Sequence, residues 1–341
     1  MMIATKMKSV LFFCLAPLVA AQLVSVPWPT PSARSMNLTM FVPWRPRSFS
    51  RSRPRYRRAR LSPAPAALAP AHAPPPPPPL ALRCRGYGVV NATGTRFNWY
   101  MALLDDLSRF SIRLPAGGCA VRATTTATAV ANKCAVAVNA GFFQFSPKPT
   151  YCLGEVVVDG AIEEWANDGS PLFATSVATK TTWLGPLTKA DVAAKQISFA
   201  ASGFGFIVAD GKASPDGVAR AERAERALRL ARGQRAEEVA PRTVLAVDAQ
   251  GRAMVVAIDG VEALLLGVTV SELADIFTGG AVGAEVLKAQ HAINMDGGGS
   301  TTMSASPGWP ADAIVFNRPT NTDTGPITER EVTCIACIAG A

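Results

Sequence analysis

The stretch His291-Ala-Ile-Asn-Met-Asp-Gly-Gly-Gly-Ser-Thr-Thr-Met303 decides how the rest of the chain is interpreted. Ala292, Ile293 and Met295 are typical of a buried strand, which then meets Asp296 and three consecutive glycines. Glycine has no Cβ, so its backbone adopts positive φ angles and approaches a ligand closely. Successive N–H groups in such a turn can converge on an anion. The stretch therefore predicts a strand that ends in an anion-binding loop; the alternative is a simple glycine turn between two strands.

The sequence on both sides of this stretch is typical of a β-rich domain. Short apolar or β-branched runs predict strands over residues 86–90, 97–103, 109–113, 134–138, 243–247, 253–258 and 332–338. Asp159-Gly160 and Asp210-Gly211 each follow an apolar run, which predicts two hairpins with tight turns.

Helices are fewer than strands in this prediction. Thr269-Val-Ser-Glu272 is a capping box and starts a helix. A second helix is expected around Val282–Gln290, and the Ala-, Arg- and Glu-rich residues 216–238 are interpreted as an exposed helical insertion with little chemistry of its own. The predicted fold class is therefore α+β, a single domain of mixed β-sheets with hairpins, flanked by helices, over residues 83–341.

The first 82 residues have a different composition from the rest of the chain. Residues 1–21 combine two lysines, an apolar run and small residues at the end, which predicts a secretory signal peptide; a signal anchor and a plastid-type transit segment are alternatives. Residues 22–82 are rich in Arg and Pro and predict a disordered pro-segment or linker. The basic cluster at residues 55–60 is of the kind that secretory convertases cut.

The charge and the metal-ligating residues exclude several classes of function. The first 82 residues hold eleven of the 34 basic side chains and no acidic one, so residues 83–341 carry 23 basic and 25 acidic residues. The folded part is thus not expected to bind nucleic acid. The only histidines are His72 and His291, which excludes a His-rich metal site, and no cofactor is expected. Beyond the signal segment, no stretch has the roughly 20 apolar residues that cross a bilayer.

Four further pieces of sequence carry side chains suited to chemistry. Asn139 and Gly141 follow an apolar strand, Arg242 begins a strand, and Asp259 ends the next one. Arg242 has the planar fork that grips a phosphate in two places. Glu272 is expected to cap its helix first and to serve as a catalytic carboxylate second.

In this order, these pieces resemble the phosphodiester glycosidase family, from about Gly117 to the C-terminus. The matching strings are Gly117-Gly-Cys119, Asn139-Ala-Gly-Phe-Phe143, Cys152-Leu-Gly154, Pro241-Arg-Thr243, Asp259-Gly260, Ala292-Ile-Asn-Met-Asp-Gly-Gly-Gly-Ser300, Asn317-Arg-Pro319 and Arg330-Glu-Val332. The resemblance implies cleavage of a sugar from a sugar-1-phosphodiester, commonly in the secretory pathway. It also implies disulfides Cys119–Cys152 and Cys134–Cys337, which leaves Cys84 and Cys334 as a third pair.

The implied reaction assigns roles to the candidate residues. The sugar C1–O bond breaks through an oxocarbenium-like centre, and the leaving group is a phosphate monoester. Donors that hold the phosphate charge are expected to include Arg242 and the loop residues Gly297, Gly298, Gly299, Ser300 and Thr301. The carboxylate candidates are Asp296, Asp259 and Glu272, while Asn139 and Gly141 are expected to contact the substrate.

Two other functions remain open at this point. A phosphodiesterase of other specificity is disfavoured because no cluster of metal ligands is expected. A secreted carbohydrate- or phosphate-binding module without turnover is the alternative outside the enzymes. Asn37-Leu-Thr39 and Asn91-Ala-Thr93 are glycosylation sites if the chain enters the secretory pathway, lumenal or extracellular.

Overall fold

The computed structural model describes residues 24–27, 81–144, 150–231, 239–261, 264, 266–305, 314–320 and 328–340. The predictions about the signal peptide, Asn37 and the basic cluster at 55–60 lie outside these residues. Within them, strands and helices build an α+β fold, which confirms the predicted class. Every ladder between named strands of the described chain is antiparallel.

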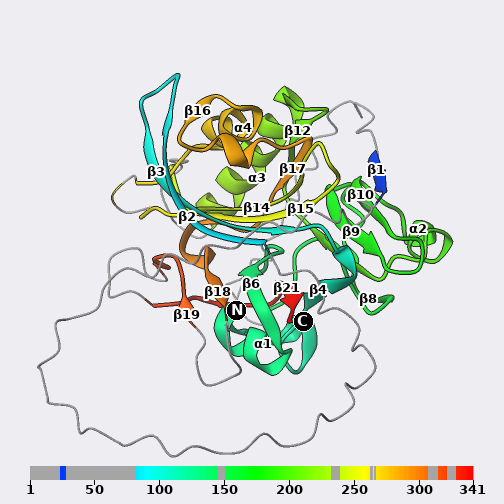
Figure 1. Ribbon diagram of the computed structural model, residues 1–341. Helices are drawn as coiled ribbons and strands as arrows, with labels where there is room; N and C mark the ends of the chain where they lie inside the picture. Colours follow the sequence, from blue (N-terminus) through cyan, green and yellow to red (C-terminus); the bar gives the residue numbers. More distant parts are fainter. Residues whose placement is uncertain are drawn as a thin grey trace, which may run out of the picture.

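An eight-stranded sheet forms the centre of the molecule (Figure 1). In sheet order its strands are β13 (Lys212–Ala213), β12 (Gly205–Ala209), β17 (His291–Asn294), β14 (Arg242–Val247), β15 (Ala253–Ile258), β3 (Arg96–Leu104), β2 (Ala81–Val90) and β16 (Ala281–Val282). Both faces of this sheet are covered, so its central strands are apolar on both sides. In β3, Trp99 and Met101 enter one hydrophobic cluster and Tyr100 and Ala102 enter the other.

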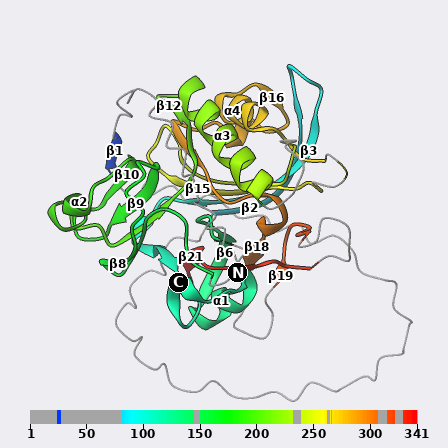
Figure 2. The same ribbon diagram turned by 180° about the vertical axis from the view of Figure 1, so that it is seen from behind.

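Two helices cover one face of the eight-stranded sheet, α3 (Pro215–Ala231) and α4 (Val270–Thr278) (Figures 1 and 2). The predicted capping box begins α4, where Thr269 and Glu272 exchange both hydrogen bonds. The expected helix around Val282–Gln290 is wrong. Val282 belongs to β16, and Gly283 has a φ of 75° and lies so close to β2 that a Cβ would be 2.4 Å from the Tyr87 carbonyl oxygen.

Two smaller sheets pack against the other face. The five-stranded sheet has the order β19 (Ile314–Val315), β18 (Met303–Ala305), β6 (Cys134–Asn139), β21 (Ile335–Ala339) and β4 (Phe110–Arg113). The six-stranded sheet has the order β1 (Val24–Pro27), β10 (Thr181–Gly185), β9 (Leu172–Ser176), β11 (Phe199–Ser202), β7 (Val156–Val158) and β8 (Ala161–Glu164). A two-stranded sheet pairs β20 (Glu331–Val332) with β5 (Ala123–Thr124). The remaining helices are α1 (Thr125–Ala131), α2 (Lys189–Ala194) and short 3-10 turns at Leu107–Arg109, Gly118–Ala120, Glu285–Leu287 and Gly298–Ser300.

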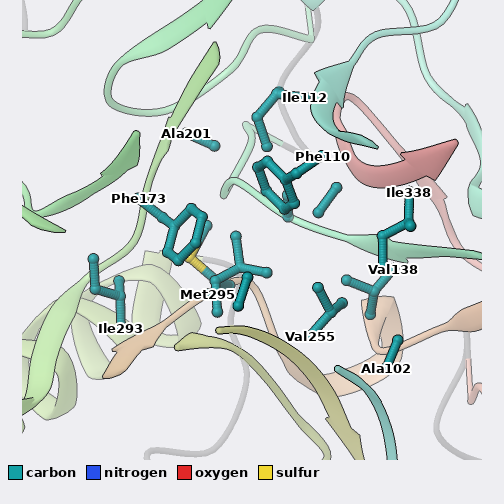
Figure 3. Close-up of a cluster of buried hydrophobic side chains, with 14 of the residues drawn as sticks. Ala102, Phe110, Ile112, Val138, Phe173, Ala201, Val255, Ile293, Met295 and Ile338 are labelled. Atoms are coloured by element: carbon teal, nitrogen blue, oxygen red, sulfur yellow. The ribbon is translucent and has the colours of Figure 1, made fainter. Parts of the chain in front are cut away.

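The main hydrophobic core lies where the three larger sheets meet (Figure 3). Figure 3 shows Val255 of the eight-stranded sheet, Val138 of the five-stranded sheet and Phe173 of the six-stranded sheet around Met295. Met295 is fully buried. The residue that immediately precedes Asp296 is therefore fixed in the densest part of the protein.

Most of the predicted strands are confirmed, and so are the two hairpins. Asp159-Gly160 joins β7 to β8 and Asp210-Gly211 joins β12 to β13, with positive φ at both residues of each turn. The N-terminal boundary differs from the prediction, because β1 at Val24–Pro27 lies inside the stretch expected to be disordered and pairs with β10.

The disulfides follow the resemblance in two cases out of three. Cys119–Cys152 and Cys134–Cys337 are formed, and the second joins β6 to β21. Cys334 is a free, buried thiol, so its predicted pairing with Cys84 is wrong.

Candidate active site

The loop that begins at Asp296 connects two sheets. The Met295 N–H donates to Thr243 in the eight-stranded sheet (2.9 Å), and the Asp296 N–H donates to Ala140, just after β6 of the five-stranded sheet (2.9 Å). The chain then enters β18, which pairs with β6. Asp296 is only 5 % exposed. The loop is therefore fixed to both sheets before and after its glycines.

Close packing requires Gly297 and Gly299, and a positive φ favours glycine at Gly298. A Cβ on Gly297 would lie 2.8 Å from the Pro241 carbonyl oxygen, and Gly298 has a φ of 59°. A Cβ on Gly299 would lie 2.3 Å from a terminal nitrogen of Arg330. The Gly298 N–H donates to the Pro241 carbonyl at 2.8 Å, so this amide is engaged with the protein rather than held ready for an anion.

Asn139 holds the loop in place from the end of β6. Its Nδ2 donates to the Asp296 carbonyl (2.6 Å), and its Oδ1 accepts from the Thr243 hydroxyl (2.8 Å) and the Thr302 N–H (3.1 Å). The side chain is completely buried. Asn139 thus positions the loop at both ends, and its expected contact with the substrate stays a prediction.

A buried thiol lies beside the Asp296 loop. The Gly141 N–H donates to the Cys334 sulfur at 3.0 Å, and a Cβ on Gly141 would lie 3.3 Å from that sulfur. Gly141 is therefore explained by the approach of the thiol. Burial, together with the nearby negative charge of Asp296, raises the pKa of Cys334 to about 12, so the group stays protonated.

Asp259 is linked to the far end of the same loop. Its Oδ1 accepts from the Arg318 N–H at 2.9 Å. The neighbouring Asn317 accepts from the Met303 N–H (2.7 Å) and donates to the Thr301 carbonyl (2.8 Å). Burial raises the pKa of Asp259, and the donors at Arg318, Tyr100 and Asn317 oppose that rise only in part.

Comparison with known proteins shows the family of this chain. Residues 132–339 match the model of the phosphodiester glycosidase family. The chain belongs to that family. No curated protein sequence matches it.

Three solved structures are similar to this phosphodiester glycosidase. The catalytic domain of zebrafish N-acetylglucosamine-1-phosphodiester alpha-N-acetylglucosaminidase, auto-inhibited by its pro-peptide, has a TM-score of 0.58 and 20 % identity over 75 % of this chain and 82 % of its own. A hypothetical protein from Synechocystis has a TM-score of 0.48 and 15 % identity over 74 % of this chain and 61 % of its own. A putative exported protein from Burkholderia pseudomallei has a TM-score of 0.47 and 15 % identity over 74 % of this chain and 76 % of its own. At these identities the likeness concerns the fold.

The structure separates Glu272 from the other candidates of the phosphodiester glycosidase. Glu272 caps α4, on the helix-covered face of the central sheet, and accepts hydrogen bonds from the hydroxyls of Thr93 and Thr95. Burial acts to raise its pKa, but the donors at Thr93, Thr95 and Thr269 outweigh burial and the pKa is lowered. Glu272 is a helix cap, as its sequence position first indicated.

Arg242 is buried and ion-paired, whereas the sequence suggested an accessible side chain that binds phosphate. It is 1 % exposed, and its Nη1 lies 2.5 Å from Oε2 of Glu225 on α3 while its Nε donates to the Val268 carbonyl at 2.9 Å. Glu225 also accepts from Asn294 at 2.7 Å. The helix interpreted as an exposed insertion therefore supplies a buried charge that supports the strand leading into the loop.

Two charged residues near the site were missed from the sequence. Arg330 packs against Gly299, and the only signal for it was the string Arg330-Glu-Val332, quoted above without a role. Glu155 is 2 % exposed, and burial, followed by the charge of Asp168, raises its pKa. Its backbone N–H donates to the Ser202 hydroxyl at 2.9 Å. Glu155 followed the matching string that ends at Gly154, and nothing in its spacing indicated burial.

The described part of the chain gives two further findings about possible ligands and membranes. It contains no group of three or more His, Cys, Asp or Glu side chains suited to a metal ion. None of its helices has both the length and the apolar character needed to cross a bilayer.

Proposed function

We propose that this phosphodiester glycosidase hydrolyses a sugar-1-phosphodiester and releases the sugar, of the N-acetylglucosamine type. The observation that carries the proposal is the Asp296 loop. A buried carboxylate begins a glycine turn that is clamped by Asn139 and fixed to two sheets, in a chain of this family. Such fixed placement is what a catalytic carboxylate requires.

In this proposal, two carboxyl groups have separate roles in the reaction. Asp296 acts on the sugar carbon, as a nucleophile or by activating water. Asp259, whose pKa is raised by burial, is the carboxyl group proposed to donate a proton to the leaving oxygen. Asn317 supports this pairing because it links the Asp259 neighbourhood to the backbone of Thr301 and Met303.

Departure of the phosphate leaving group is expected to depend more on hydrogen-bond donors than on a general acid. A phosphate monoester is already a weak base, so holding its charge should accelerate the reaction more than protonating it. Ser300 and Thr301 supply hydroxyls at the end of the glycine turn, and both are 1 % exposed. Glycosides that lack the phosphate are therefore expected to be poor substrates.

We also place the protein in the secretory pathway, as a lumenal or extracellular enzyme. Its two disulfides support an oxidising compartment. Asn91, one of the two predicted glycosylation sites, is exposed in the turn between β2 and β3. The zebrafish enzyme is auto-inhibited by its pro-peptide, and residues 22–60, the part of the tail up to the basic cluster, are proposed as a removable pro-segment here.

Turnover by the purified protein tests the proposal, measured both on the uncut chain and after cleavage in the basic cluster at residues 55–60. The substrate is a methyl diester of N-acetylglucosamine-1-phosphate, assayed with and without a chelator, and the matched probe is an aryl N-acetylglucosaminide without phosphate. Release of the sugar from the diester alone, unaffected by chelator, is expected. Chelator-sensitive cleavage on the other side of the phosphate would favour a phosphodiesterase, and saturable binding without release would favour a binding module.

A further inference from the structure

An arginine from the C-terminal region packs directly on the triple-glycine loop. A Cβ on Gly299 would lie 2.3 Å from Nη2 of Arg330 and 2.7 Å from its Cζ, distances at which no side chain fits. The guanidinium therefore occupies the space that the missing side chain leaves. Arg330 is 9 % exposed, at the border between buried and accessible.

The chain on both sides of Arg330 is anchored. Before it, Glu329 accepts a hydrogen bond from the Thr126 N–H at the start of α1 (2.9 Å). After it, Glu331 and Val332 form β20, which pairs with β5. A guanidinium held between two such anchors keeps its position before a ligand arrives, which lowers the entropic cost of binding.

Two buried hydroxyls follow Gly299 in the same turn. Ser300 Oγ and Thr301 Oγ1 are each in a residue that is 1 % exposed, and neither makes a hydrogen bond to the described residues. Buried polar atoms of this kind are usually paired. Both hydroxyls directly follow Gly299, on which the Arg330 guanidinium packs, so the turn combines hydroxyl donors with a positive charge. Such a combination suits a ligand that accepts several hydrogen bonds and carries negative charge.

We propose that Arg330, together with the hydroxyls of Ser300 and Thr301, binds the phosphate of the substrate; this assignment rests on the proposed function. A guanidinium donates two parallel hydrogen bonds to phosphate oxygens, and the hydroxyls donate to the others. In this proposal Arg330 has the phosphate-binding role that the sequence had suggested for Arg242. The charge of Arg242 is compensated by Glu225, on the helix-covered face of the central sheet.

Inorganic phosphate, as a competitive inhibitor of the full-length enzyme, tests this assignment. Arg330→Gln removes the charge, Arg330→Lys keeps the charge without the fork, and Arg96→Gln removes an exposed arginine at the start of β3 as a matched control. The inhibition constant of phosphate is expected to weaken about 10- to 100-fold in Arg330→Gln, and less in Arg330→Lys. The KM for the diester should rise in parallel, while Arg96→Gln stays at the wild-type values.

Gly299→Ala provides a second, independent variant. It leaves Arg330 in the sequence, but the new Cβ would lie 2.3 Å from the guanidinium and 2.7 Å from the Thr320 carbonyl oxygen. The guanidinium and the loop are therefore forced apart, and phosphate inhibition should weaken here too. Folded Arg330→Gln or Arg330→Lys protein with wild-type phosphate inhibition and KM would overturn the assignment. If the wild type turns over no diester, the proposed function fails, and calorimetric titration of the same variants with inorganic phosphate then decides the role of Arg330 separately.

Discussion

At the scale of single residues, Asp296 is the side chain on which the proposed reaction depends. Asp296→Asn keeps the size and the backbone hydrogen bonds of the loop but removes the charge that an oxocarbenium-like centre needs. We expect kcat to fall by about 10²-fold or more, the scale typical of one catalytic group, with little change in thermal stability. Asp105→Asn, at an exposed position after β3, is the matched control. Near-normal turnover of the diester by Asp296→Asn would remove the loop from catalysis.

Glu155 gives a residue-scale prediction about pH. Its pKa is raised in the folded protein by burial and by Asp168, so the folded state favours the protonated form. The stability that Glu155 contributes is therefore full below its unfolded pKa and is lost as pH rises through the folded value.

The variant Glu155→Gln removes this dependence. Compared with the wild type, it should gain stability at pH 7 and lose that advantage as the pH falls toward the unfolded pKa of about 4.3. Urea unfolding of both proteins across this range, with Glu163→Gln as the exposed control, measures the difference. A constant difference at all pH values would show that Glu155 is not the titrating group.

At the scale of elements, the strands were predictable because their sequence patterns are local. Alternating or continuous apolar runs and Asp-Gly turns specified β3, β14, β15 and both hairpins. Helix α4 was predictable from its capping box. The segment at Val282–Gln290 was not, because a long-range pairing of β16 with β2 overrides its local preference.

The loop of the candidate site could be predicted from the sequence, but the contacts between its side chains and distant residues could not. Asp296 and its glycines are consecutive residues, so the loop could be recognised from the sequence alone. The partner of Arg242 lies on a helix 17 residues earlier in sequence, and the residue that packs on Gly299 lies beyond the next strands. Which of the two arginines faces the loop depends on long-range structure. Arg242 projects from β14 toward α3, and Arg330 is placed by the anchors on either side of it.

The pair between α3 and β14 leads to an element-scale prediction about stability. Arg242→Leu would leave Glu225 buried without its arginine partner and is expected to cost roughly 3–5 kcal/mol of unfolding free energy. The double variant Arg242→Leu with Glu225→Leu should recover much of this loss, because it removes both buried charges. Denaturant unfolding of the two single variants and the double variant measures the coupling; additive losses would contradict a direct ion pair.

At the scale of the whole molecule, β1 connects the tail to the folded body. Val24–Pro27 forms the edge of the six-stranded sheet and pairs with β10, although residues 28–80 separate it from β2 in sequence. Any cut in the basic cluster at 55–60 would therefore leave β1 attached without a covalent link, through strand pairing and the packing of Val26 on the main core. An edge strand of four residues supplies few hydrogen bonds.

Cleavage of the tail is the prediction that belongs to this scale. If residues 22–60 are a removable pro-segment, secreted protein should begin between Tyr56 and Ser62, after an arginine. N-terminal sequencing checks the site of the cut, and comparison of native with denaturing mass spectrometry checks whether the released segment stays bound through β1 and β10. Replacing the arginines of residues 55–60 by glutamine should yield protein that begins at Gln22. Wild-type secreted protein that already begins at Gln22 would show that the basic stretch is a linker, and β1 would then be a permanent strand of the six-stranded sheet.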